Sequence, residues 1–192
     1  QKYAKRKPKS IKDIQITEFL HLDNGWKIIT NQDEFNTKIL VNAAGAWSDI
    51  VATNVGVQKI NIVPKKRTVF CFKPKNIKLN NEWPLGVDVE ENFYFKVEHD
   101  TVIASPADET PTVPHDAQAE DIDIALGIER IKYSTLFEFS SISNKWAGLR
   151  SFVEDKSPVI GFDNKIHNFF WFAGQGGYGI QTAPALSKIA SN

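Results

Sequence analysis

Apolar residues occur at strand or helix spacing in several stretches of the 192-residue chain. Near the N-terminus they predict strands over residues 11–19 and 26–30, joined by a turn at 23–25. Two further apolar runs, at 38–42 and 169–173, are each followed by small residues and then by a segment of helical composition. The pattern therefore predicts two strand, turn, helix units, one toward each end of the chain.

The middle of the chain has a different pattern. From about residue 63 to residue 144, short predicted strands are interrupted by six prolines. One helix is predicted over about 119–134, where Ile124, Ile128 and Ile131 lie on one face. This region is expected to form a sheet that packs against a helix.

The most specific motif lies near the C-terminus. Gly174, Gly176 and Gly179 form a G-x-G-x-x-G between the apolar run and the predicted helix at 180–190. Glycines allow close backbone approach to a ligand, and amides at a helix N-terminus attract negative charge. Only 13 residues follow Gly179, too few for the second parallel strand of a nicotinamide-binding unit. The spacing alone fits ligand binding and a packing turn equally well.

Three segments carry a family resemblance: VNAAGAWS at 41–48, WAGLRSFVEDKSPVIGF at 146–162 and AGQGGYGIQTAPALS at 173–187. In this order they resemble the second half of the D-amino-acid oxidase family of FAD-dependent oxidoreductases, which includes glycine oxidase, sarcosine oxidase and D-amino-acid dehydrogenases. The resemblance begins at about Ile14. The family's opening strand and its G-x-G-x-x-G have no match here, and residue 1 is Gln1, so we expect a C-terminal fragment that is inactive alone.

The resemblance implies an α+β fold in three parts. Residues 1–62 would be part of a Rossmann-like FAD-binding domain. Residues 63–144 would form a substrate-binding domain with a large mixed, mainly antiparallel sheet backed by helices. Residues 145–192 would return to the FAD-binding domain and end in the glycine turn and its helix.

The resemblance also assigns site residues. Arg150 would bind a substrate carboxylate, because a planar guanidinium presents paired donors that match two carboxylate oxygens. Tyr178 would be either a wall of the active site or a packing residue beneath the flavin ring. The expected FAD contacts are Ala43, Ala44, Gly45, Trp47, Gly174, Gly176, Gly177, Tyr178, Gly179 and Ile180.

The function implied by the family is oxidation of the C–N bond of a small, carboxylate-bearing amine, with FAD as hydride acceptor. No separate catalytic acid or base is expected. The electron acceptor stays open, and a homo-oligomer or an electron-accepting partner is compatible with the sequence. Arg67 would either lie near the flavin or belong to a solvated strand end. The competing hypothesis is a non-catalytic module or subunit that binds a carboxylate or a partner protein without flavin.

Composition excludes several other classes. The chain has 23 basic and 23 acidic residues, which gives no overall attraction to nucleic acid, and the basic cluster from Lys2 to Lys12 is expected to be a solvated arm or strand edge. No apolar run is long enough for a membrane span. The four histidines lack metal-ligand spacing. Cys71 is the only cysteine, is expected to be buried and inert, and favours a reducing compartment such as the cytoplasm.

Overall fold

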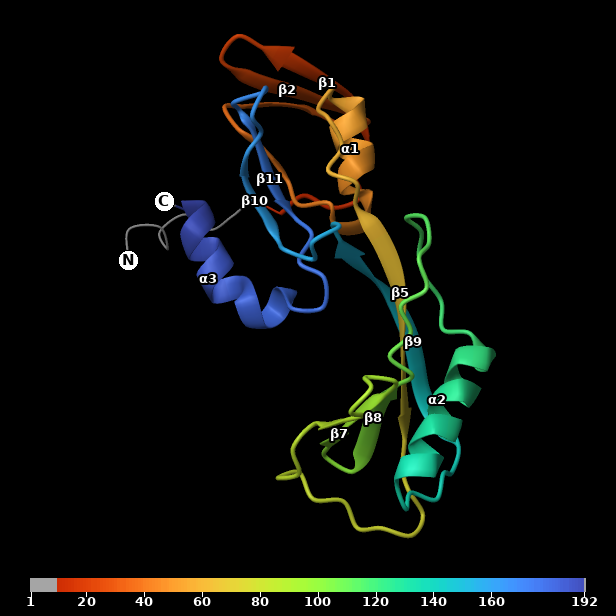
Figure 1. Ribbon diagram of the computed structural model, residues 1–192. Helices are drawn as coiled ribbons and strands as arrows, with labels where there is room; N and C mark the ends of the chain where they lie inside the picture. The colour runs from red at the N-terminus through yellow and green to blue at the C-terminus, as the bar shows by residue number, and fades with distance from the viewer. Residues whose placement is uncertain (1–9, 192) are drawn as a thin grey trace.

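A computed structural model describes residues 10–191 (Figure 1). The elements in chain order are β1 (Ile16–Leu22), β2 (Gly25–Thr30), β3 (Glu34–Thr37), β4 (Leu40–Asn42), the 3-10 helix η2 (Gly45–Trp47), α1 (Ser48–Asn54), β5 (Val63–Phe72), β6 (Gly86–Val87), β7 (Tyr94–Glu98), β8 (Thr101–Ser105), α2 (Asp121–Ser134), β9 (Ile142–Phe152), β10 (Val159–Phe162), β11 (Phe169–Ala173) and α3 (Gly179–Ser191). The strands form three sheets, ordered β1-β2-β3, β10-β11-β4 and β6-β7-β8-β5-β9.

The two predicted strand, turn, helix units come together in one sheet. β4 and β11 pair in parallel, with Leu40 opposite Phe169, and β10 pairs antiparallel to β11. Helix α1 follows β4, and α3 follows β11, as predicted. Trp26 from β2 packs with Phe169 and Trp171 of β11 in the core beneath this sheet. The side chain of Asp49, in the first turn of α1, accepts the amides of Ile60 and Ile62, which fixes the chain after the helix.

The five-stranded sheet is antiparallel at every pairing that the structure describes. This confirms the expected mainly antiparallel sheet, and one helix, α2, packs against it. Phe70 and Phe72 of β5 meet Ile124 and Ile131 of α2 in its core. The predicted isoleucine face of α2 is therefore the buried face. Cys71 is also buried, and burial raises the pKa of its thiol, so the reactive thiolate is disfavoured as expected.

The longest pairing in the molecule joins β5 and β9, from Val63 opposite Phe152 to Phe72 opposite Ile142. These two strands run from the upper part of the molecule to the lower part (Figure 1). The prediction of short strands broken by prolines is wrong for β5, because Pro64 lies near its start, where a missing amide is tolerated. The boundary expected after residue 144 falls inside β9, and the three-part division remains a prediction.

The buried face of α2 generates a stability prediction. Ile131 is fully buried, whereas Ile122 in the same helix is 71% exposed. Ile131→Ala should lower the free energy of unfolding by about 3 kcal/mol, because it removes packed methyl groups and leaves a cavity. Ile122→Ala should change it by less than about 0.5 kcal/mol. Urea denaturation of the chain measures both, and equal losses would contradict the assigned core.

Candidate functional site

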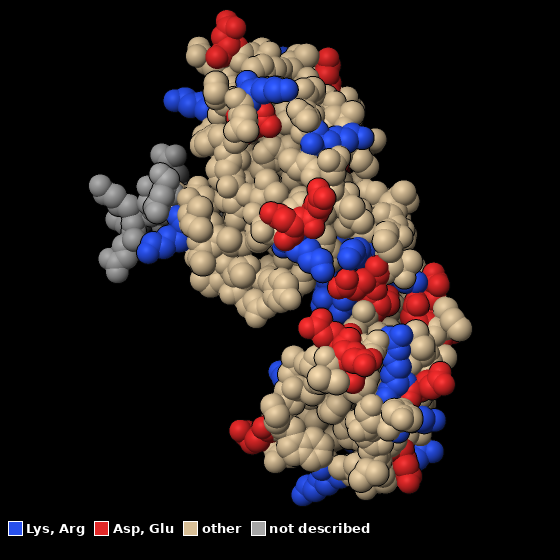
Figure 2. Space-filling view, in the orientation of Figure 1, with Lys and Arg blue, Asp and Glu red and all other residues tan. Residues whose placement is uncertain are grey.

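A hollow of about 630 Å³ lies where the five-stranded sheet meets the C-terminal glycine turn. We call it the arginine hollow. Its lining includes Arg67, Tyr94, Glu109, Arg150, Gly177 and Tyr178. Three of these are predicted site residues: Arg150 lies in β9, and Gly177 and Tyr178 lie in the glycine turn. Figure 2 shows acidic and basic side chains gathered at the waist between the upper and lower parts of the molecule.

The β5–β9 register brings the basic side chains together. Lys65 lies opposite Arg150, and Arg67 lies opposite Gly148. Paired residues in a sheet point to the same side, as do residues two apart in one strand. Lys65, Arg67 and Arg150 therefore share one face, while Lys66 and Thr68 point to the other face and bind Asp123 of α2.

Arg150 is the cation of this face that lacks a partner. Its side chain is half-buried and packs against the backbone of Gly177. A Cβ added at Gly177 would lie 2.9 Å from Nη1 of Arg150. Within residues 10–191, the hydrogen bonds and ion pairs of arginine involve Arg67 and Arg130 and leave the Arg150 guanidinium without one. The paired donors of this guanidinium are available to a planar anion.

Arg67, by contrast, is buried and bound within the protein. Only 8% of the residue is exposed. Its Nε donates to the carbonyl oxygen of Asp108 at 2.8 Å, and its Nη2 pairs with Glu109 Oε1 at 3.0 Å. Its guanidinium also lies over the ring of Tyr94, 5.8 Å from the centroid. The alternative of a solvated strand end is therefore wrong for Arg67, and a position near the flavin remains a prediction.

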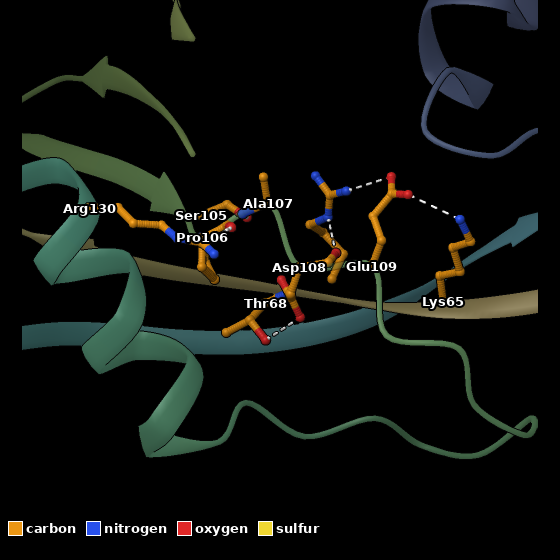
Figure 3. Close-up of polar contacts among 9 residues, drawn as sticks. Lys65, Thr68, Ser105, Pro106, Ala107, Asp108, Glu109 and Arg130 are labelled. Carbon is orange, nitrogen blue, oxygen red and sulfur yellow. Dashed lines mark hydrogen bonds and ion pairs between the residues drawn. The ribbon is translucent and has the colours of Figure 1, made fainter. Parts of the chain in front are cut away.

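Glu109 lines the hollow and bridges two cations of β5. Its Oε2 pairs with Lys65 Nζ at 3.0 Å, while Oε1 holds Arg67 (Figure 3). Partial burial raises the pKa of the Glu109 carboxyl, but the hydrogen bond and charge of Lys65, together with the charge of Arg67, outweigh burial and hold that pKa below its usual value. Glu109 is thus a permanent carboxylate at neutral pH.

The glycine turn is shaped by packing against β9. Gly176 has φ +56°, its amide donates to the carbonyl oxygen of Ser151 at 2.9 Å, and an added Cβ would lie 2.6 Å from the Phe152 ring. Gly174 also has positive φ, and Gly179 begins α3. Since the amide of Gly176 is bound within the protein, a flavin contact from this turn would have to come from other residues of the turn. Beyond it, Tyr178 and Ile180 are exposed, and Ile180 is 96% exposed.

A second hollow, of about 450 Å³, contains the other group of predicted cofactor residues. Ala43, Ala44, Gly45 and Trp47 face the middle of β9 there. The side-chain oxygen of Asn42 accepts the Ala44 amide at 3.3 Å, and its nitrogen donates to the Ser48 carbonyl oxygen at 2.9 Å, which fixes this turn. Trp47 is 43% exposed, so its side chain is open to the hollow and is not part of the core.

Both hollows border β9, one through Leu149 and the other through Arg150. A Cβ added at Gly45 or at Gly148 would contact nothing within 4 Å. The space next to these two glycines is therefore open. This space suits a flat or extended group that approaches the backbone closely.

The predicted site residues did not include Tyr94 and Glu109, which line the arginine hollow, or Lys65, which pairs with Glu109. The spacing of Lys65 and Arg67 in one strand was the available signal for a shared face. No metal-binding group of three or more His, Cys, Asp or Glu occurs in residues 10–191, and no helix in this range is long and apolar enough to span a membrane. The basic residues from Lys2 to Lys9 lie outside the described part of the chain.

Comparison with known proteins gives a family match. Residues 9–192 match the family model described as FAD dependent oxidoreductase (DAO). The chain is 30% identical over 174 residues to FAD-dependent oxidoreductase domain-containing protein 1 of Xenopus laevis, which covers 80% of this chain and 34% of that protein. It is 25% identical over 181 residues to glycerol 3-phosphate dehydrogenase of Caloramator mitchellensis, covering 90% and 37%, and 26% identical over 188 residues to mitochondrial dimethylglycine dehydrogenase of Homo sapiens, covering 88% and 22%.

Solved structures share the fold. L-proline dehydrogenase from P. horikoshii superposes with a TM-score of 0.74 at 23% identity, over 93% of this chain and 48% of that one. Glycine oxidase from Geobacillus kaustophilus gives a TM-score of 0.75 at 18% identity, over 93% and 47%. The chain thus spans about half of these structures and little more than a third, at most, of the relatives matched by sequence.

Two glycines with the same backbone conformation test the packing of the glycine turn. Gly45 and Gly176 both have φ +56°, but only at Gly176 would a Cβ collide with a neighbour, the Phe152 ring. Gly45→Ala should cost about 1–2 kcal/mol of stability from the left-handed backbone alone. Gly176→Ala should cost about 1–3 kcal/mol more, from overpacking. Urea denaturation of the two variants measures the difference, and equal losses would show that the turn does not pack against Phe152.

Proposed function

The chain belongs to the FAD-dependent oxidoreductase (DAO) family, and from this premise we propose that the complete protein oxidises the C–N bond of a small amine that carries a carboxylate. The observation that carries the proposal is the unpaired guanidinium of Arg150 in the arginine hollow. A substrate carboxylate would accept hydrogen bonds from the paired donors of this guanidinium. Charge-assisted hydrogen bonds of this kind are worth about 1.5–3 kcal/mol.

The family binds FAD, and the second hollow fits such a group. The turn from Ala43 to Trp47 would lie along the cofactor, where Gly45 and Gly148 leave open space for it. Gly177, Tyr178 and the start of α3 would face the flavin end. FAD supplies a hydride acceptor when bound.

The residues of this chain would then orient the substrate and exclude water. Arg150 would hold the carboxylate, which fixes the direction of the neighbouring C–N bond. Tyr178 would cover the mouth of the hollow, since it lines the hollow and is 61% exposed. No acid or base residue is required for hydride transfer, so the proposal assigns none.

The relatives support an anionic substrate but differ in its class. One is named a dimethylglycine dehydrogenase, which acts on an amine with a carboxylate, and another a glycerol 3-phosphate dehydrogenase, which acts on a phosphate ester. A guanidinium can bind a carboxylate or a phosphate with two parallel bonds, and the carboxylate is proposed because the family resemblance assigns carboxylate binding to Arg150.

Two arginines of this chain separate substrate binding from structure. Arg150→Lys in the complete protein should raise KM for the substrate about tenfold or more, because lysine keeps the charge but loses the two-pronged contact, with stability nearly unchanged. Arg130 instead donates to the carbonyl oxygens of Asn92 and Pro106 at 2.8 and 2.7 Å. Arg130→Lys should lower the melting temperature and leave KM unchanged. Unaltered kinetics in the Arg150 variant would show that Arg150 is structural.

The 192-residue chain alone should not retain FAD. In a dinucleotide-binding fold a strand, G-x-G-x-x-G and helix hold the pyrophosphate, and the only such motif here is the C-terminal turn, whose Gly176 amide is bound to Ser151. Purification with added FAD followed by gel filtration measures retention. A stoichiometrically yellow chain would refute this expectation, whereas a colourless complete protein would favour the non-catalytic module.

A further inference from the structure

We propose that Glu109 is a resident carboxylate that makes the arginine hollow selective for substrates with one carboxylate over substrates with two. The inference rests on the proposed function, in which Arg150 binds the substrate carboxylate. It narrows the substrate class to amines whose remaining part is neutral or cationic.

The hollow contains two guanidinium groups, and one of them already binds a carboxylate of the protein. Arg67 and Arg150 both line it. Glu109 already occupies Arg67, with Oε1 3.0 Å from Nη2, and its Oε2 lies 3.0 Å from Lys65 Nζ. A second substrate carboxylate would therefore find the second guanidinium bound to a carboxylate of the protein.

The segment that carries Glu109 is fixed on both sides. Before it, the Asp108 carboxylate accepts the Thr68 amide at 2.7 Å and the Thr68 hydroxyl at 3.0 Å (Figure 3). After it, the carbonyl oxygen of Thr110 accepts the Lys66 amide at 2.9 Å. Thr68 is fully buried, so these contacts are shielded from water. The backbone of Glu109 is held against β5 and cannot swing away as a unit.

Displacing only the Glu109 side chain would also be unfavourable. The displaced carboxylate would lose its contacts with Arg67 and Lys65 together, and the incoming carboxylate would regain only part of them. An incoming carboxylate would meet the like charge of Glu109 before it reached Arg67. A neutral or cationic substrate group meets no such repulsion.

Two other charged residues line the hollow, Glu91 and Lys156. They are opposite in sign, and both are exposed, as Glu109 also is. Unlike Glu109, neither forms an ion pair within residues 10–191, so neither is fixed in place. Glu109 is the acidic group of the hollow that is fixed between two cations of the sheet. It is therefore the residue that sets the preference.

Butanoate and succinate test the selectivity, because succinate has a carboxylate where butanoate has a methyl group. Each is titrated into the complete, FAD-loaded protein, and the change in flavin absorbance gives its Kd. The wild-type protein should bind butanoate more tightly. Glu109→Gln should lower the ratio of the succinate Kd to the butanoate Kd by about tenfold or more, since it removes the repulsion and frees Arg67.

Glu120→Gln is the matched control. Glu120 also pairs with a lysine, Lys66, at 3.3 Å, but it does not line the hollow. Its substitution should leave the ratio unchanged. If Glu109→Gln failed to retain FAD, Glu109→Asp keeps the charge on a shorter side chain that cannot span both cations, and the ratio should still fall about threefold.

An unchanged ratio in the Glu109 variants would overturn the inference, as would a wild-type protein that binds succinate at least as tightly as butanoate. Butanoate binding to the Arg150→Lys variant tests the proposed function separately. If Arg150→Lys leaves butanoate binding unaffected, the proposed function itself fails. If butanoate binding requires Arg150 but the ratio of the two Kd values is unchanged in the Glu109 variants, only the selectivity inference fails.

Discussion

The antiparallel register between β5 and β9 is the constraint on which the rest of the structure depends. It places Arg150 opposite Lys65 and leaves the side-chain-free Gly148 opposite Arg67. Because successive residues of a strand face opposite sides, a slip by one residue would send Arg150 to the face covered by α2 and bring Leu149 into the arginine hollow. The packing of Phe70 and Phe72 against α2 fixes which face of β5 is buried, and Ile142 of β9 packs against the same core.

The basic side chains of β5 are paired with carboxylates, so their burial is tolerated. Lys66 is half-buried, and although burial lowers the pKa of its ammonium group, the hydrogen bonds and charges of Asp123 and Glu120 outweigh burial and raise that pKa. No buried side-chain nitrogen or oxygen in residues 10–191 lacks a hydrogen-bond partner. A half-buried guanidinium without an internal partner, as at Arg150, therefore stands out against a sheet whose other basic groups are paired.

Local patterns in the sequence predicted the local elements well. The run at 169–173 has the same bounds as β11, and the helix expected at 119–134 is α2 at Asp121–Ser134. The three ordered motifs also indicated the family correctly. The 11-residue strand β9 was not predicted as one element, because its exposed and buried positions do not alternate regularly. Its extent is set by pairing with β5, about 80 residues earlier.

Local sequence patterns could not predict the carboxylate partners of the basic residues in β5. The run Lys65, Lys66, Arg67 suggests a solvated surface, but its carboxylate partners come from a loop some 40 residues away and from α2. Glu109 lies in an acidic, proline-containing stretch that gives no local signal of burial. Arg150 was found only through the family motif, and its lack of a partner is visible only once the sheet is assembled.

The most direct test of this account is a crystal structure of the complete protein with FAD and a bound monocarboxylate ligand. The account predicts two parallel contacts of about 2.8 Å between the Arg150 guanidinium and the ligand carboxylate, with the Arg67–Glu109–Lys65 contacts intact. A ligand bound away from Arg150, or an Arg150 guanidinium paired with a carboxylate from another part of the protein, would contradict it.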